Sequence, residues 1–406
     1  MHSVRVFLTA HGAASFATGI HQVLLAWLSI QLLHLTSVEI GWVQCAALLP
    51  TIGWMLVAGV WADRTRPILL MVLAQILMVL SFIGLALLVY KNSLNFSYLL
   101  VYAVLVGTAN AFVQPVREKI VGELSDHSLQ IKISRASLVQ FSLQSLGIVL
   151  ASSSEYVGLL AIIGAQIIAT LISAALLYRL SLQKLSVAAE PPGRELSSNL
   201  ERGFRTELKQ GIAFVLKDKP MGHLLALIAF NGFVHMGVFL VAVPIIARDV
   251  YHLNALQYGM LQFSFVAGML LAYLLLLNKP KQHFPGQGAL FSLLYSAIVG
   301  FALARTPTLT GLYMLLVFWG WVAGHSSTHC RVVLQQLAAK QPELKGRLVS
   351  IYQMTLFGMA PLGALVVGYV AEYHAVGELF QAMAIASVLL FVVFLFSRSL
   401  WQIRQE

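Results

Sequence analysis

Long apolar segments follow one another along almost the whole chain, separated by short polar ones. A helix needs about 20 residues to cross a hydrocarbon core of roughly 30 Å, and twelve segments reach that length. They are 5–33, 39–62, 67–90, 96–118, 132–154 and 157–180 in a first group, and 221–247, 256–278, 286–304, 309–333, 346–371 and 377–398 in a second. The pattern predicts an all-α integral membrane protein of twelve transmembrane helices in two six-helix halves.

A long polar segment, 181–220, separates the two groups. Pro191-Pro192-Gly193 breaks any helix there, and Ser198 and Glu201 then have the spacing of a capping box at the start of a new helix. Apolar residues recur on one face of that helix, namely Leu200, Phe204, Leu208, Ile212 and Val215. We predict an N-terminal half at 1–180, a C-terminal half at 221–406, and between them a cytoplasmic linker whose amphipathic helix lies on the membrane surface.

The composition agrees with a membrane protein. Charged residues make up 10% and hydrophobic residues 59% of the 406 residues, whereas a soluble domain carries about 25% charged residues. The mean hydropathy is +0.81. The apolar run that follows Arg5 continues past a cleavage-like sequence at Ala13-Ala14-Ser15 as far as Leu33, so we expect the first span to be retained rather than removed as a signal peptide.

Basic residues lie on one side of the predicted helices. With the N-terminus in the cytoplasm, all 26 lysines and arginines except Lys91, Arg248 and Arg305 fall in cytoplasmic segments or at cytoplasmic helix ends. The positive-inside rule therefore places both termini in the cytoplasm. The same distribution explains the net charge of +10 without nucleic acid, because the basic residues are scattered at helix ends that face anionic lipid.

The loop between the second and third predicted spans carries a motif. It reads Gly59-Val60-Trp61-Ala62-Asp63-Arg64-Thr65-Arg66-Pro67, which resembles the signature loop of the major facilitator superfamily. The resemblance implies that the glycine lets helices approach closely and that Asp63 pairs with basic groups at neighbouring helix ends, latching the cytoplasmic side. We expect Arg117 to be the partner of Asp63. The equivalent loop of the second half, 278–283, contains no aspartate.

Other positions narrow the resemblance. They are Pro50, Pro244, the run Lys345-Gly346-Arg347, Gly358, Pro361, Gly363 and Gly368, and they are similar to the branch that contains bacterial macrolide-type drug exporters and the enterobactin exporter. The resemblance covers essentially the whole chain and implies a secondary transporter of the bacterial inner membrane, in which two six-helix halves rock about a midplane cavity. The gate residues that it implies are Gly59, Asp63, Arg64, Arg66, Arg117 and Arg347.

In this fold the first, fourth, seventh and tenth helices line the cavity, so their polar residues are candidates for binding substrate. These residues are His11, Gln22, Asn110, Gln114, Asn231, His235, His325, His329 and Arg331. Further glutamines, namely Gln44, Gln140, Gln144, Gln262 and Gln353, lie on flanking helices. Arg117 and Arg331 belong either to the substrate site or to the gate.

Aspartate and glutamate are absent from the middle of every predicted span. A buried carboxylate is the usual proton carrier of a transporter, so a histidine, which titrates near neutral pH, is the candidate carrier here; uniport and coupling through carboxylates at the rim stay open. Several bases without an acid favour an anionic substrate. Export of a polycarboxylate or catecholate siderophore is the leading hypothesis, and the alternatives are multidrug efflux of amphipathic compounds and import of a small anionic solute.

The sequence lacks the parts of an enzyme or an ATP-driven pump, because it has neither a phosphate-binding Gly-rich lysine loop nor a catalytic constellation. His325 and His329 have the spacing of a metal pair on one helical face, but no carboxylate is near them in sequence, and we predict no metal site. We expect a monomer without a cofactor, whose partners are a small-molecule substrate, protons as a candidate coupling ion, and the lipid bilayer. A channel and a membrane receptor or scaffold are the competing classes.

Overall fold

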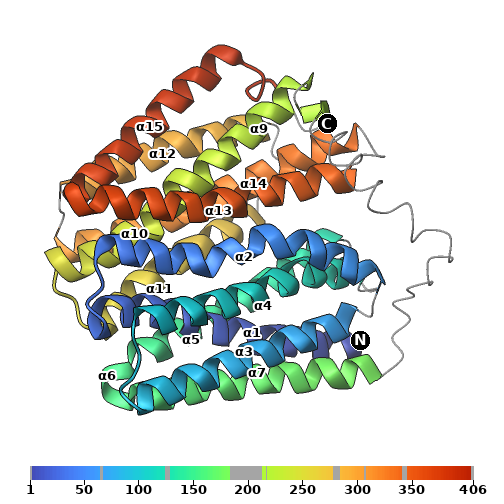
Figure 1. Ribbon diagram of the computed structural model, residues 1–406. Helices are drawn as coiled ribbons and strands as arrows, with labels where there is room; N and C mark the ends of the chain where they lie inside the picture. Colours follow the sequence, from blue (N-terminus) through green and yellow to red (C-terminus); the bar gives the residue numbers. More distant parts are fainter. Residues whose placement is uncertain are drawn as a thin grey trace. The chain divides into compact units, whose positions relative to one another are not determined.

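The computed structural model describes residues 2–64, 67–123, 129–182, 213–215, 217–277, 284–305, 308–340 and 345–403, and the regular structure of these residues is helical (Figure 1). The chain forms two compact units. The first unit is Met1–Pro192 together with Pro244–Phe263, and the second is Gly193–Val243 together with Ser264–Glu406.

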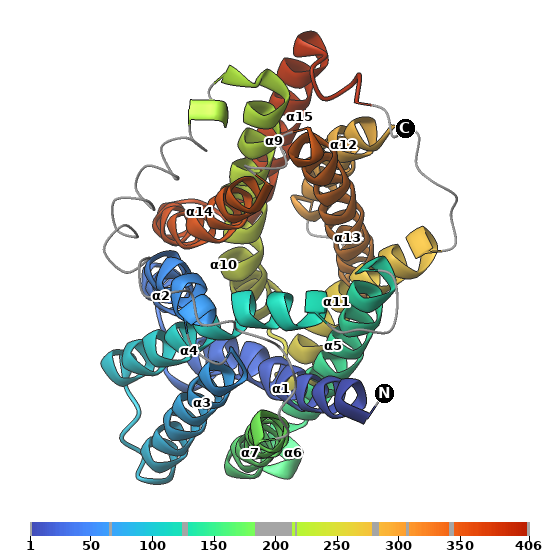
Figure 2. The same cartoon turned by 90° about the vertical axis from the view of Figure 1, so that its right-hand side faces the viewer.

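The first six long helices belong to the first unit. They are α1 (His2–Trp27), which continues as the π-helical segment η1 (Leu28–Leu32), then α2 (Ser37–Arg64), α3 (Pro67–Tyr90), α4 (Phe96–Glu123), α5 (Leu129–Ser152) and α7 (Leu159–Leu182). A short helix, α6 (Ser154–Val157), joins α5 to α7. Helix α1 packs against α5 and α7, α2 packs against α4, and α3 packs against α4 and α7; Figure 2 shows most of these helices obliquely.

The remaining helices follow in the same order as the predicted spans. The seventh span is α9 (Lys219–Phe230), η3 (Asn231–Met236), α10 (Gly237–Ile245) and η4 (Ile246–Val250) in succession, where η3 and η4 are π-helical. After it come α11 (Ala255–Leu277), α12 (Pro285–Leu303), α13 (Leu309–Ala339), α14 (Lys345–Tyr373) and α15 (Val376–Ser397). Within the second unit, α12 packs against α13 and α15, and α14 packs against η3 and α9.

Each of the twelve predicted spans coincides with one of these long helices, so the predicted fold class is confirmed. Within the described ranges, nine helices are long and apolar enough by themselves to cross a membrane, and α2, α5 and α13 complete the twelve. The amphipathic helix expected in 181–220 lies almost wholly outside the described residues. That linker and the half boundaries at 180 and 221 stay predictions.

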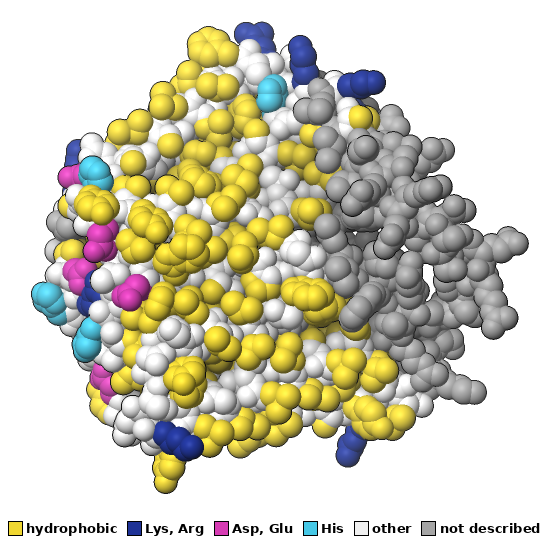
Figure 3. Space-filling view, in the orientation of Figure 1, with side chains coloured by type: hydrophobic (Ala, Val, Ile, Leu, Met, Phe, Trp, Pro, Cys, Tyr) yellow, Lys and Arg dark blue, Asp and Glu magenta, His cyan; other side chains and the backbone are white. Residues whose placement is uncertain are grey.

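The surface of α3 shows why these helices need lipid. Leu73, Leu80 and Leu87 recur every seven residues, hence on one face of the helix, and their exposed fractions are 56%, 60% and 54%. Figure 3 shows hydrophobic side chains over most of the described part of one face of the molecule, with charged side chains gathered towards its margins. Such an apolar surface is stable only in contact with hydrocarbon.

Glycines allow the closest helix contacts in both units. A Cβ atom added at Gly147 of α5 would lie 2.1 Å from the carbonyl oxygen of Phe16 on α1, and one added at Gly19 of α1 would lie 2.1 Å from the carbonyl oxygen of Gln144. In the second unit, a Cβ at Gly363 of α14 would lie 1.9 Å from a carbonyl oxygen of η3. The first and fifth long helices of each half therefore cross through small residues, as membrane helices often do, which supports an internal duplication.

We expect Gly147→Ala to destabilise the protein by about 1–3 kcal/mol, because the new methyl group overlaps the backbone of α1 and forces the two helices apart. Gly164→Ala is the matched control, since no atom lies within 4 Å of a Cβ at Gly164 and alanine is the better helix former. The fraction of each detergent-solubilised variant that stays monodisperse after heating measures the effect. Equal melting of the two variants would contradict the close crossing.

Candidate functional site

A chain of side-chain amides, partly or fully buried, crosses the first unit. Gln144 of α5 donates a hydrogen bond from Nε2 to Oε1 of Gln22 on α1, at 2.9 Å. Gln22 in turn donates from Nε2 to Oε1 of Gln262 on α11, at 3.0 Å, and Gln262 donates to the Tyr258 hydroxyl at 2.8 Å. A side-chain amide both donates and accepts hydrogen bonds, so each glutamine can bond to the next one in the series. Among the predicted site residues, Gln22 is thus held by two residues that the sequence placed only on flanking helices.

Arg117 of α4 donates from Nη1 to Oε1 of Gln140 on α5, at 3.0 Å. The side chain of its expected partner Asp63 lies outside the described residues, so that ion pair stays a prediction. His11 of α1 is buried and stacks on Phe7, with ring centroids 6.2 Å apart. Among the described residues, no group bonds to Nε2 of His11.

The other expected residues of the first unit are placed only in part. Asn110 is half-buried on α4. Gln114 lies on the same helix, but its side chain is outside what the structure describes; the same holds for the surroundings of the expected gate residues Gly59, Asp63, Arg64, Arg66 and Arg347. Their roles stay predictions.

A hydrogen-bonded junction in the second unit surrounds the π-helical segment η3. Asn231 donates from Nδ2 to the hydroxyl of Ser326 on α13, at 3.3 Å, and Ser292 of α12 donates to the same hydroxyl at 3.0 Å. The ring of His235 contacts Oδ1 of Asn231 through Nδ1 and the hydroxyl of Ser387 on α15 through Nε2, both at 3.0 Å. One asparagine and one histidine therefore tie η3 to α13 and α15, and Ser292 connects α12 to the same junction through Ser326. π-helical turns occur frequently at functional sites.

The junction has room for either charge state of His235. Oδ1 of Asn231 only accepts, so Nδ1 carries a proton. In the neutral ring, Nε2 accepts from the Ser387 hydroxyl. In the charged ring, Nε2 donates to that hydroxyl, which turns to Met383, whose carbonyl oxygen lies 2.8 Å from it. Rotation of one hydroxyl thus lets the ring gain a proton without losing a hydrogen bond.

Aromatic and imidazole rings stack along α13. Phe318 stacks on Trp321 with centroids 5.6 Å apart, Trp321 stacks on His325 at 5.2 Å, and the rings of His325 and His329 are 4.0 Å apart. Nδ1 of His329 donates to the carbonyl oxygen of His325 at 2.7 Å, so its Nε2 is the basic nitrogen. A Cβ at Gly288 of α12 would lie 2.1 Å from the His329 ring, which means that a glycine is needed there for the ring to fit.

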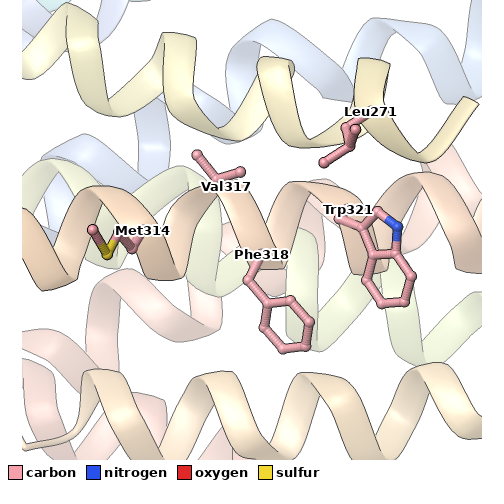
Figure 4. Close-up of a pocket in the computed structure, with 5 residues that line it drawn as sticks. All are labelled: Leu271, Met314, Val317, Phe318 and Trp321. Atoms are coloured by element: carbon pink, nitrogen blue, oxygen red, sulfur yellow. The ribbon is translucent and has the colours of Figure 1, made fainter. Parts of the chain in front are cut away.

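An apolar hollow of about 470 Å³ lies at one end of this stack. Figure 4 shows Val317 of α13 and Leu271 of α11 between the two helices, while Phe318 and Trp321 project in the same direction from α13. Met314 completes the lining. Trp321 both lines the hollow and stacks on His325. The apolar hollow therefore lies next to the imidazoles of His325 and His329.

The structure therefore divides the expected site residues into local groups. Arg331 of α13 is exposed. Across the described ranges, no three side chains of histidine, cysteine, aspartate or glutamate come together as metal ligands. Ser326 is a polar residue of the tenth predicted span, but Ser292 and Ser387 were not foreseen as partners, because a serine in a helix usually bonds to its own backbone.

Comparisons with known proteins agree with this architecture. A family model described as transmembrane secretion effector matches residues 2–404. None of the curated proteins matches the sequence.

Solved structures share the fold at low sequence identity. The nucleoside transporter NupG is 12% identical, with a TM-score of 0.73 over 99% of this chain and 100% of that one. A structure described as giving insight into proton-dependent oligopeptide transporters is 12% identical, with a TM-score of 0.71 over 99% of both chains. A bacterial homologue of the human lysosomal transporter Spinster, inward-facing and unoccupied, is 15% identical, with a TM-score of 0.63 over 100% of this chain and 98% of that one.

At these identities the structures establish the fold, and the family match over residues 2–404 establishes the lineage. The protein is a multi-pass secondary transporter rather than an enzyme. The chain belongs to the transmembrane secretion effector family of major facilitator transporters.

Proposed function

We propose that the protein exports a small anionic metabolite across the bacterial inner membrane by alternating access, with a siderophore as the leading substrate and both termini in the cytoplasm. Membership of a family described as secretion effectors supports the outward direction. The charge distribution supports the orientation, since only Lys91, Arg248 and Arg305 fall on the opposite side from the other basic residues.

The proposal of an anionic substrate rests on the kind of polar side chain found in the membrane helices. Within the described helices, aspartate and glutamate occur only within two turns of a helix end. Their middles hold bases and neutral donors, such as His235, His325, His329 and Gln22. Burying a carboxylate without a partner costs several kcal/mol. Helices rich in donors and bases offset that cost for an anion, whereas a cation would find no buried carboxylate there.

Protons are the proposed coupling ion. A proton-dependent oligopeptide transporter shares the fold, and a histidine titrates in the range where a bacterial membrane maintains its pH difference. His235 is the best placed of the candidates, because Ser387 accommodates both of its charge states. The ring centroids of His325 and His329 lie 4.0 Å apart, so positive charges on both rings would repel each other.

The gate and the division into halves also belong to the proposal. Asp63 would latch the cytoplasmic side with Arg117, supported by Gly59, Arg64, Arg66 and Arg347. The halves 1–180 and 221–406 would rock on the linker 181–220, and the protein would work as a monomer.

Multidrug efflux is the second candidate, and the hollow beside Trp321 is the observation that favours it. Its lining of Leu271, Met314, Val317 and Phe318 suits an apolar group, and the neighbouring His325 suits a polar end. An amphipathic compound would fit these surroundings as well as a siderophore would. Import of a small anionic solute is the remaining alternative.

We expect secretion to accelerate as the external pH falls from about 8 to about 6, because an external proton protonates the carrier histidine and returns inward in exchange for substrate. His235→Gln should flatten this pH profile. His223→Gln is the matched control, since His223 bonds to Ser399 near the chain's C-terminal end. The secretion rate is measured in cells over that pH range, with His325→Gln and His329→Gln in parallel. If none of the three flattens the profile, protons are carried elsewhere.

A strain that lacks the gene should secrete less siderophore under iron starvation and retain more of it inside the cell. The wild-type gene should restore secretion, and Asp63→Asn should not, although the variant should reach the membrane in normal amounts. Siderophore is quantified in medium and in washed cells by mass spectrometry. Unchanged secretion, together with new sensitivity to macrolides or dyes, would show that the substrate is an amphipathic drug-like compound.

A further inference from the structure

Two helix connections of the first unit have the same local structure. The first turn, residues 28–39, runs from η1 into α2, and the second turn, residues 246–257, runs from η4 into α11. Each contains a histidine in the left-handed region, with φ of 49° at His34 and 50° at His252, followed by a buried leucine, Leu35 or Leu253. Residues other than glycine uncommonly adopt the left-handed conformation. Its recurrence at matching positions therefore indicates that the two connections share one local structure.

The backbone and the caps repeat as well. Leu33 donates to the carbonyl oxygen of Leu28, and Leu35 to that of Ser29; likewise Tyr251 donates to Ile246 and Leu253 to Ala247, all within 2.9–3.1 Å. A capping box then starts each following helix, formed by Thr36 and Glu39 in the first turn and by Asn254 and Gln257 in the second. The two turns are therefore built independently, each from its own residues.

The two turns bond to each other in a reciprocal way. Arg248 of the second turn donates from Nη1 to the carbonyl oxygen of Leu35 at 2.7 Å. Gln31 of the first turn donates from Nε2 to the carbonyl oxygen of Leu253 at 3.5 Å. In each direction a long polar side chain reaches the carbonyl of the other turn's buried leucine. Asp249 holds the guanidinium of Arg248 in place with a forked contact at 2.5 and 3.1 Å.

Further contacts reinforce this pairing. Glu155 of α6 accepts from the backbone N–H of Ala255 at 3.0 Å, which places a carboxylate at the positive end of α11. Tyr258 of α11 stacks on Trp27 of α1 with centroids 6.1 Å apart. Because Gly259 has no side chain, α11 packs directly against Ser152 of α5.

Helix α11 belongs to both units, so these contacts resist its displacement from the first unit. The helix is continuous from Ala255 to Leu277, yet its residues up to Phe263 group with the first unit and those from Ser264 group with the second. It contains no proline, and bending it would cost backbone hydrogen bonds. The chain enters the first unit at Pro244, whose ring removes a backbone donor and eases bending of the preceding span. If the units move against each other, the contacts of the second turn release more readily than α11 bends.

We propose that residues 28–39 and 246–257 form a clasp that holds the extracellular side of the transporter closed and releases once in each cycle. Arg248 and Gln31 are its positioning residues. The proposal rests on the alternating access and orientation proposed above, and on the reciprocal bonds to Leu35 and Leu253.

The test follows entry of a membrane-impermeant maleimide from outside intact cells. The natural cysteines, Cys45 and Cys330, are buried and are replaced by alanine. The reporter is Thr18→Cys, because Thr18 is exposed on α1. It lies four residues before Gln22, hence farther along α1 from residues 28–39 than Gln22 does. Labelling of the reporter after denaturation gives the total amount of inserted protein, so a misfolded variant is recognised.

With the clasp intact, external labelling should be slow. Arg248→Ala removes a hydrogen bond from a charged donor and should raise the labelling rate about tenfold. Gln31→Ala should raise it less, and the double variant at least as much as Arg248→Ala alone. Arg305→Ala is the matched control, since Arg305 is an exposed arginine predicted on the same side; its rate should stay within about twofold of the parent.

Unchanged labelling in Arg248→Ala and in Gln31→Ala, or an equal rise in Arg305→Ala, would overturn the clasp. The measurement requires no substrate, so it separates this inference from the proposed export. Faster labelling without siderophore export would support the clasp and contradict the proposed substrate. Siderophore export without any change in labelling would support the substrate and contradict the clasp.

Discussion

A polar group inside a hydrocarbon core has no water to bond to, so each one needs a partner from the protein itself. The backbone meets this constraint because the regular structure of the described residues is helical. The side chains meet it by bonding between helices, through the amide chain of Gln22, Gln144 and Gln262 in one unit and the junction of Asn231 and His235 in the other. These bonds select which helices pair, and they concentrate the polar chemistry in two places.

The same constraint connects structure to transport. A protein that carries charge across lipid must offer the substrate the bonds that it loses from water. The described helices offer them as imidazole and amide groups. At His235, a hydroxyl with two acceptors within reach lets the ring take a proton while every donor keeps a partner. Glycine crossings repeated in both halves, and turns repeated at 28–39 and 246–257, provide the duplicated frame on which such groups can move.

Much of the fold could be predicted from the sequence, because a bilayer-spanning helix leaves a signal of about 20 apolar residues. The partners of the polar residues could not. Gln22 and Gln262 are far apart in sequence, and nothing local says that their amides meet. The π-helical course of η3, which packs against α14, was likewise not foreseen from the sequence. The matching turns did leave a signal that sequence reasoning overlooked: His34-Leu35-Thr36 in one half and His252-Leu253-Asn254 in the other.

If this chain alone moves an anionic solute, the purified protein should do so in vesicles of bacterial phospholipid. The vesicles are loaded with the small-molecule extract of iron-starved cells and placed in acidic buffer. Mass spectrometry then identifies which solutes leave, compared with protein-free vesicles. We expect one or a few anionic solutes to leave faster with the protein present, and the release to depend on the pH difference. Selective release of cationic or neutral amphipathic compounds, or a bulk ionic leak typical of a channel, would contradict it.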